Sequence, residues 1–156
     1  ISLAKRHVFA RQLVNTGRMS TPNIYSNSRV CGPTGGRALQ NVALRWADGS
    51  AGDLADLLRW AQGRLLLLVF GVLKPAQLRQ IVMLTDHTDM RTVHVPGRGM
   101  PATIKEHVLD PEGHLAASVG GVGWALLRPD SYIAATGQQI DAEFTRTLNT
   151  ACGNSA

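Results

Sequence analysis

The chain has 156 residues, a formal net charge of +5 and a sequence pI near 9.9; 44% of its residues are hydrophobic and 17% are charged. This length accommodates one domain with a hydrophobic core, and the composition excludes an intrinsically disordered chain. The longest apolar run, Leu65–Phe70, is too short to span a membrane, and no basic-then-apolar export signal opens the chain. We therefore expect a cytoplasmic protein that does not bind membranes.

The excess positive charge is not organised as a nucleic-acid site. Lys5, Arg6 and Arg11 are concentrated in the first segment, and the later arginines are scattered without interleaved aromatic residues. The two cysteines, Cys31 and Cys152, lie far apart and form no C-x-x-C pair, which favours free thiols over a disulfide framework or a zinc site. We expect no nucleic-acid partner and no bound metal.

The first 36 residues differ in character from the rest. Residues 2–16 have helical composition, and Gly17 stands where such a helix would end. Polar and turn residues then continue to Gly36, which is typical of a linker or a long loop and places a domain boundary before Arg37. Because the chain begins with Ile1 rather than methionine, we expect a processed product or a fragment of a longer protein. The alternative is a helix that docks on its own domain.

Residues 37–70 predict a strand, a short helix and a buried strand. Residues 41–46 alternate apolar and polar side chains, and Asp48-Gly49 is a strong turn signal. We expect Ser50 to be the N-cap of a helix that ends at Gly63, and the Asp53 carboxylate to accept from the free backbone N–H groups at the start of this helix. The residues expected to form the apolar stripe of this helix are Leu54, Leu57, Leu58 and Ala61. Leu65–Phe70 is apolar on both faces, as in a central strand covered on both sides.

The next stretch predicts a helix and a second strand. Pro75 suits the first position of a helix whose Leu78, Ile81 and Val82 face inward. Residues 91–95 alternate again, with Val93 and Val95 apolar, as in a half-buried strand. The sum is an α/β fold: a mixed sheet with helices on both faces.

The C-terminal third is the most informative region. A turn at 110–113 and a short helix at 114–119 precede an apolar strand, Trp124–Leu127. Pro129-Asp130 is a turn signal, and residues 132–135 resume as a second strand, so the two form a hairpin. A helix should follow Gly137, because four apolar residues recur on one face: Ile140, Phe144, Leu148 and Ala151.

This region carries a resemblance to a known family. Asp110, Gly113 and Leu115 are followed by residues 124–127, the word Arg128-Pro129-Asp130-Ser131-Tyr132, an Ile-Ala strand and an amphipathic helix to Leu148. The pattern resembles the C-terminal end of FAD-dependent aromatic-ring hydroxylases, most of all those related to 3-(3-hydroxyphenyl)propionate hydroxylase and phenol hydroxylase. The resemblance implies a thioredoxin-like domain in residues 37–156. It also implies that residues 1–36 are the last helix of an upstream catalytic portion plus a linker.

The sequence contains no recognisable motif for catalysis or for binding a cofactor. In a thioredoxin-like fold a redox thiol pair would follow the central strand, and residues 71–75 contain no cysteine. No G-x-G-x-x-G follows a strand and no G-x-S-x-G is present, so Ser118 and Ser131 have no nominated base. Arg128 is interpreted as structural, pairing with an acid or capping a carbonyl near the turn. We assign no catalytic, cofactor-binding or metal-binding residue.

The histidines and nearby acids receive the same interpretation. They lack the spacing of zinc ligands, so we expect ordinary surface or cap residues and a solvated polar loop at Asp86, His87 and Asp89. The histidines are His7, His87, His94, His107 and His114.

Two hypotheses of function remain. In the first, the chain is the C-terminal structural or oligomerisation domain of an FAD- and NAD(P)H-dependent monooxygenase that hydroxylates a phenolic or other aromatic substrate. Its partners would be the upstream FAD and substrate domain and, in a homodimer, a second copy, while FAD and NAD(P)H would bind only the full-length parent. In the second, the chain is a free-standing, redox-inactive thioredoxin-like binding module.

Overall fold

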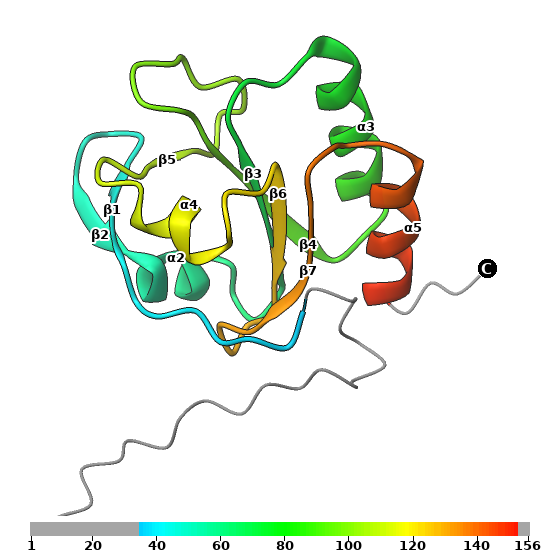
Figure 1. Ribbon diagram of the computed structural model, residues 1–156, viewed down its shortest axis with the longest axis horizontal. Helices are drawn as coiled ribbons and strands as arrows, with labels where there is room; N and C mark the ends of the chain where they lie inside the picture. The colour runs from blue at the N-terminus through cyan, green and yellow to red at the C-terminus, as the bar shows by residue number, and fades with distance from the viewer. Residues whose placement is uncertain (1–34, 153–156) are drawn as a thin grey trace, which may run out of the picture.

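The computed structural model describes residues 35–152 (Figure 1). The helix expected over residues 2–16 and nearly all of the expected linker lie outside the described residues. The elements in chain order are β1 Ala43–Trp46, β2 Ala51–Asp53, α2 Leu54–Trp60, β3 Leu65–Phe70, α3 Pro75–Asp86, β4 Met90–Val95, β5 Val108–Leu109, α4 His114–Ser118, β6 Trp124–Leu127, β7 Ile133–Gly137 and α5 Ala142–Ala151. Within this part of the chain, no helix combines the length and apolar character needed to cross a bilayer.

A four-stranded mixed sheet in the order β4-β3-β6-β7 forms the centre of the fold. The central strand β3 pairs parallel with β4 and antiparallel with β6, and α3 is the crossover between the two parallel strands. The predicted hairpin of β6 and β7 is confirmed, with a register shift between Leu126 and Leu127. Beside β7, the N–H groups of Gly36 and Leu39 donate to the carbonyls of Ile133 and Ser131. The first described residues therefore lie along the β7 edge of the sheet.

A second, three-stranded sheet has the order β2-β1-β5 and is antiparallel throughout. His107, the residue before β5, connects the three-stranded sheet to the four-stranded sheet through an isolated parallel bridge with His94 of β4. The N–H of His94 donates to the carbonyl of Glu106 at 3.0 Å. The C-terminal half of the β4 edge is thereby covered by residues 106–108.

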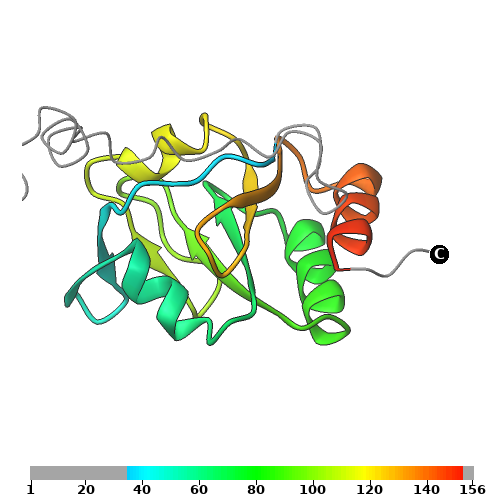
Figure 2. The same cartoon turned by 90° about the horizontal axis from the view of Figure 1, so that it is seen from below.

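The core consists of two hydrophobic clusters on the opposite faces of β3. Leu66 and Leu68 point into the cluster that also contains side chains of α2 and α4. Leu67 and Val69 point into the cluster that contains side chains of α3 and α5. Figure 2 shows these two pairs of helices on opposite sides of the sheet. The expectation of a central strand covered on both sides, with helices on both faces, is confirmed.

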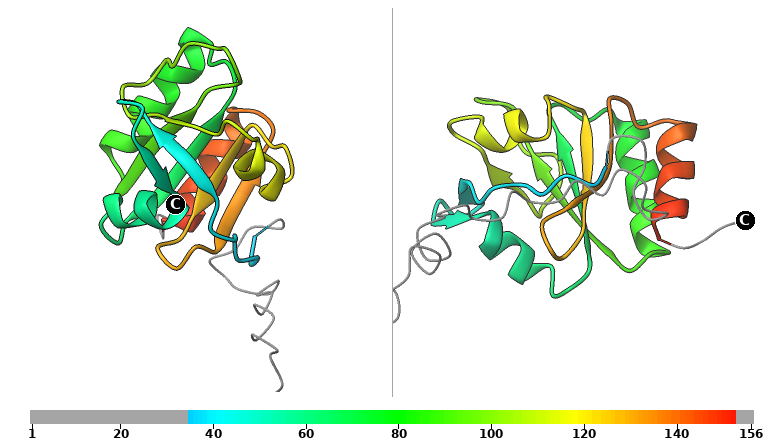
Figure 3. Two further views of the ribbon diagram at one scale, coloured as in Figure 1. Left: turned by 90° about the vertical axis from the view of Figure 1, so that its left-hand side faces the viewer. Right: turned by 60° about the horizontal axis from the view of Figure 1, so that its bottom comes forward.

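Helices α3 and α5 lie side by side on one face of the sheet (Figure 3). Gln80 of α3 donates through Nε2 to the carbonyl of Asp141 at 3.0 Å and to Thr145 Oγ1 at 2.9 Å. Phe144 and Leu148 of α5 are buried, and Ile140 and Ala151 pack against the same cluster. The four apolar positions predicted for this helix therefore share one face, as expected.

Two local expectations were wrong, and two short strands were not predicted. The N-cap of α2 is Asp53, whose carboxylate accepts from the Asp56 N–H, and Ser50 lies before the short strand β2, which was not expected. Strand β5 was not expected either. Val82 of α3 does not face inward; 48% of it is exposed, while Ile81 is buried. Pro75 does occupy the first turn of α3.

Candidate functional site

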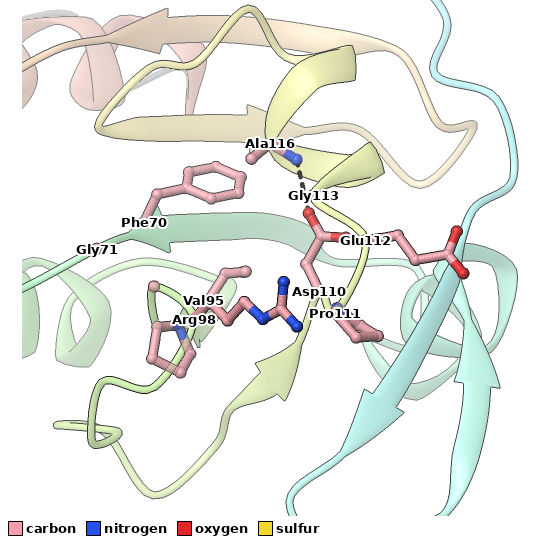
Figure 4. A pocket seen from close by; sticks show the side chains of 11 residues that line it. Phe70, Gly71, Val95, Arg98, Asp110, Pro111, Glu112, Gly113 and Ala116 are labelled. Atoms are coloured by element: carbon pink, nitrogen blue, oxygen red, sulfur yellow. Dashed lines mark hydrogen bonds between the residues drawn. The ribbon is translucent and has the colours of Figure 1, made fainter.

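A cavity of about 310 Å³ lies where the parallel strands β3 and β4 end (Figure 4). Its lining residues come from the ends of both strands, from the loop after β4 and from the turn before α4. They are Phe70, Gly71, Val95, Pro96, Gly97, Arg98, Asp110, Pro111, Glu112, Gly113 and Ala116. In open α/β sheets, ligands bind in crevices at the carboxyl ends of the strands, so this position makes the cavity the first candidate for a binding site.

Gly71 closes β3 at the edge of this cavity. Its φ is +77°, a left-handed conformation that glycine adopts without a steric cost. Its N–H donates to the carbonyl of Val95 at 3.0 Å, which ties the end of β3 to the end of β4. Val72 follows it with 69% exposure.

His94 connects the end of β3 to the loop that follows β4. Its Nε2 lies 2.6 Å from the carbonyl oxygen of Gly71, and its Nδ1 accepts from the Thr103 N–H at 3.0 Å. A carbonyl can only accept and an amide N–H can only donate, so these partners assign the neutral ring with the proton on Nε2. The ring is fully buried, and the expectation that each histidine is a surface or cap residue is wrong for His94. His94 shares one face of β4 with the buried Met90, a placement that no motif around the histidine indicates.

An acidic group and a basic group flank the cavity. Asp110 Oδ2 accepts from the Ala116 N–H at 2.9 Å, while its Oδ1 is buried with no hydrogen-bond partner among the described residues. Arg98 extends towards the same space, and Glu112 points away from it (Figure 4). Glu112 instead pairs with His114 at 3.1 Å on the surface. The cavity offers one acceptor and one guanidinium over an apolar floor of Phe70 and Val95.

In a thioredoxin-like fold, a redox-active thiol pair would lie between the central strand and the next helix, and this chain has no cysteine there. Residues 71–75 join β3 to α3, and the helix begins at Pro75 with Lys74 as its N-cap. Cys152 lies elsewhere, at the C-cap of α5, where burial raises the pKa of its thiol. A raised pKa disfavours the thiolate, which is the reactive form. Cys31 lies outside the described residues.

The other sequence candidates lie apart from the cavity. Within residues 35–152, no three His, Cys, Asp or Glu side chains are grouped as metal ligands would be. Asp89 pairs with Arg64 at 2.9 Å, and His87 is exposed at the C-cap of α3. His107 bonds the carbonyl of Lys105 at 3.0 Å. His7 lies outside the described residues.

Arg128 has the structural role expected of it. Its guanidinium pairs with Asp130 at 2.6 Å and lies 5.9 Å from the ring centroid of Tyr132. Ser131, next to this pair, adopts a φ of +67°, so the ion pair and the stacked ring hold a strained hairpin turn. The sequence Arg-Pro-Asp-Ser-Tyr thus stabilises the turn between β6 and β7.

Comparison with known proteins supports the fold. No protein-family model and no curated protein matches the sequence. Among solved structures, the chain is similar to the peroxidoxin BcpB from Mycobacterium tuberculosis, with a TM-score of 0.57 and 15% identity over 77% of this chain and 97% of that one. The described part of the chain has a thioredoxin-like fold.

Similar structures also include enzymes much longer than this chain. Aklavinone-11 hydroxylase, solved in complex with FAD and aklavinone, matches with a TM-score of 0.54 and 18% identity over 76% of this chain and 21% of that one. The rebeccamycin biosynthetic enzyme RebC matches with a TM-score of 0.55 and 19% identity over 99% of this chain and 26% of its own. The chain therefore spans about a fifth to a quarter of these enzymes.

Proposed function

We propose that this chain is the C-terminal structural domain of an FAD- and NAD(P)H-dependent monooxygenase that hydroxylates a phenolic or other aromatic substrate. The observation that carries the proposal is a thioredoxin-like fold whose thiol position, residues 71–75, lacks cysteine. The fold then serves as a scaffold, because thiol–disulfide exchange requires a thiolate as its nucleophile.

The similarity to longer hydroxylases supports the same proposal. In aklavinone-11 hydroxylase and RebC, a unit of this fold accounts for 21% and 26% of the chain, so most of each enzyme lies outside it. The sequence word around Arg128 and Asp130 resembles the corresponding family pattern and folds here as a stabilised turn. On this proposal residues 37–156 form the accessory domain. Residues 1–36 are the end of the catalytic portion with a linker.

The chemistry follows from this division. When bound to the parent protein, FAD reduced by NAD(P)H would activate oxygen for insertion into the aromatic ring. The Gly-rich fingerprint that cradles a dinucleotide is missing from this sequence, so on this proposal FAD binds to the catalytic portion of the parent. The contribution of this chain is to pack against the catalytic portion and to hold that portion in place.

A second candidate is a free-standing, redox-inactive binding module. The match to the peroxidoxin BcpB spans 97% of that chain, so a unit of this fold makes up nearly all of that protein. The strand-end cavity, with its unpartnered Asp110 Oδ1 and the guanidinium of Arg98, would then be the binding site.

Isolation of the native protein distinguishes the two candidates. We expect the intact mass and N-terminal sequence to reveal a longer polypeptide that purifies with FAD and oxidises NAD(P)H in the presence of an aromatic substrate. The 156-residue chain alone should show no flavin absorbance. A native protein that starts at or just before Ile1 contradicts the proposal, and stoichiometric FAD on the 156-residue chain contradicts the division of roles.

A further inference from the structure

The chain enters the domain by pairing with the outer border of β7. The Gly36 N–H donates to the Ile133 carbonyl at 2.7 Å, and the Ile133 N–H donates to the Arg37 carbonyl at 2.8 Å. The bridge at this border is antiparallel. Strand β7 is the last strand in the order of the four-stranded sheet, and no other described strand follows it. The direction of the pairing therefore decides which part of the domain the residues before Gly36 reach first.

That direction leads from β7 towards α5. In an antiparallel pair, moving backwards from Gly36 along the chain means moving forwards from Ile133 along β7. Four residues of β7 follow Ile133, up to Gly137, and at about 3.3 Å per residue they take up about 13 Å. An extended segment that ends at Gly36 passes Gly137 about four residues earlier, at Gly32. The residues before Gly32 then lie at the turn from β7 into α5.

A groove of about 400 Å³ lies at this turn. We call it the β7–α5 groove; it is lined by residues 135–139, by Asp141, Glu143, Phe144 and Thr147 at the start of α5, and by Trp124 of β6. The rings of Trp124 and Phe144 form its floor, edge to face with their centroids 4.9 Å apart. The groove therefore offers an apolar floor on the path that an extended segment before Gly36 follows.

The charged side chains of the groove are both acidic. They are Asp141 and Glu143. Asp141 Oδ1 accepts from the N–H groups of Glu143 and Phe144, which holds this carboxylate as the N-cap of α5. The Glu143 carboxylate forms no ion pair within residues 35–152. A cation is therefore the complementary group for this end of the groove.

The stretch before Gly36 carries one cation, at a matching distance. From Met19 to Gly36 the only charged residue is Arg29. It lies seven residues before Gly36, about 23 Å along an extended chain. The part of β7 beyond Ile133 accounts for about 13 Å of this path, so about 10 Å remain to reach the start of α5. The residue after Arg29 is apolar, as the floor of the groove requires.

We propose that residues 29–34 of this chain, which lie outside the described residues, occupy the β7–α5 groove. They continue the strand that residues 36–39 begin on β7, with the Arg29 guanidinium beside Glu143 and the Val30 side chain over the apolar floor. The upstream part of the chain then joins the domain at the start of α5. The inference does not depend on the proposed function, because the occupant is part of this chain.

Connectivity favours this occupant over a second copy of the chain. Gly35 is bonded to a residue that already pairs with β7, and a segment tethered so closely has an effective concentration of about millimolar. A strand from a second copy would have to compete with that concentration. It would also find the first part of the β7 border held by residues 36–39.

A nitroxide attached to Cys31 tests the inference in the 156-residue chain. Cys152→Ala leaves Cys31 as the single thiol, and the amide signals are compared before and after reduction of the nitroxide. We expect loss of the amide signals of Gln138 and Glu143, while the amides of α2, on the opposite face of the sheet, keep theirs. Groove signals that survive, or an equal loss over α2, overturn the inference.

A charge reversal gives a second measurement. In the labelled chain, Arg29→Glu places a third acid beside Asp141 and Glu143 and should restore much of the lost groove signal. The matched control is Arg18→Glu, which makes the same change outside the proposed segment and should leave the loss as it was. Adding Glu143→Arg to Arg29→Glu should bring the loss back. Equal effects of Arg29→Glu and Arg18→Glu, or no recovery in the double variant, overturn the inference.

A mixed sample tests the second copy directly. Isotope-labelled chain without nitroxide is mixed with nitroxide-labelled chain without isotope, so that any signal loss comes from a different molecule. We expect the groove amides to keep their signals in this sample. A loss at Gln138 and Glu143 in the mixture identifies a second copy as the occupant and overturns the inference.

Discussion

His94 is the residue that the sequence hides best, because an isolated histidine in an alternating strand carries no motif. Its buried ring joins Gly71 to Thr103, two residues in separate loops around the strand-end cavity. We expect His94→Phe to lower the free energy of unfolding by about 1–3 kcal/mol, since the Gly71 carbonyl and the Thr103 N–H both lose their partner in the buried ring. Urea denaturation measures this change. The exposed His87→Phe serves as the control, and equal effects of the two substitutions would contradict the role assigned to His94.

Gly123 is a second residue with a specific structural requirement. A Cβ at this position would lie 2.1 Å from the carbonyl oxygen of Gln138, which is backbone and cannot rotate away. We expect Gly123→Ala to destabilise the protein by about 1–3 kcal/mol through overpacking between β6 and the segment after β7. The matched control is Gly97→Ala, whose Cβ would meet only Met100 Cγ at 3.4 Å. Thermal unfolding of both variants measures the difference, and similar melting temperatures would exclude the clash.

At the scale of the elements, the start of α2 gives a prediction about pH. The pKa of Asp53 is lowered by the hydrogen bond from Asn41, and then by the bond from the Asp56 N–H. A lowered pKa in the folded state stabilises the protein above the ordinary carboxyl pKa of about 3.9, and this contribution is lost as pH falls through the folded value. Asp53→Asn should therefore lower the melting temperature at pH 7 and reduce its fall between pH 5 and pH 2.

The control for Asp53 is a carboxylate at the far end of a different helix. Asp86 is exposed in the last turn of α3, and Asp86→Asn should leave the acid dependence of the melting temperature close to that of the wild type. If the melting temperatures of Asp53→Asn and Asp86→Asn depend on pH in the same way, the Asp53 cap of α2 does not contribute to the loss of stability in acid.

The elements found from the sequence are those with strong local signals. The apolar run of β3, the proline that begins α3, the turn between β6 and β7 and the one-sided pattern of α5 each follow from residues close in sequence. Strands β2 and β5 have three and two residues, and β2 contains Gly52 and Asp53, which disfavour strands. Both exist because β1 lies between them and pairs with each. Of these two pairs, only that of β1 and β5 joins segments distant in sequence, and such pairing leaves no local pattern.

The candidate site was predictable only in its location. A thioredoxin-like strand end was expected at residues 71–75, and the cavity does border Gly71. Its other wall comes from Arg98 and Asp110, which belong to loops far along the chain and share no motif that would predict their proximity.

At the scale of the whole molecule, β3 couples the two hydrophobic clusters because it contributes side chains to both. We expect Leu66→Ala and Leu67→Ala each to cost about 2–5 kcal/mol and to destabilise both clusters together. Three tryptophans allow a direct test, since Trp46 and Trp60 pack against one cluster and Trp124 is buried in the other. In a single cooperative transition, all three report the same midpoint.

Two tryptophan variants separate these signals. Trp124→Phe leaves fluorescence on the α2 side, and the double variant Trp46→Phe/Trp60→Phe leaves it on the α5 side. Within each variant, we expect the fluorescence midpoint in urea to coincide with the midpoint measured by circular dichroism. A fluorescence transition that precedes the loss of secondary structure in either variant would show that the two faces unfold separately.

The chain reaches the described domain along β7, and β4 lies at the opposite border of the four-stranded sheet. Four strand spacings of about 4.8 Å separate the path of residues 36–39 from β4, roughly 19 Å. At about 3.3 Å per extended residue, a segment running from residue 36 to the β4 border would need at least about six residues, and more to pass around the helices. Anything joined to the domain through a shorter linker would therefore lie against its β7 side.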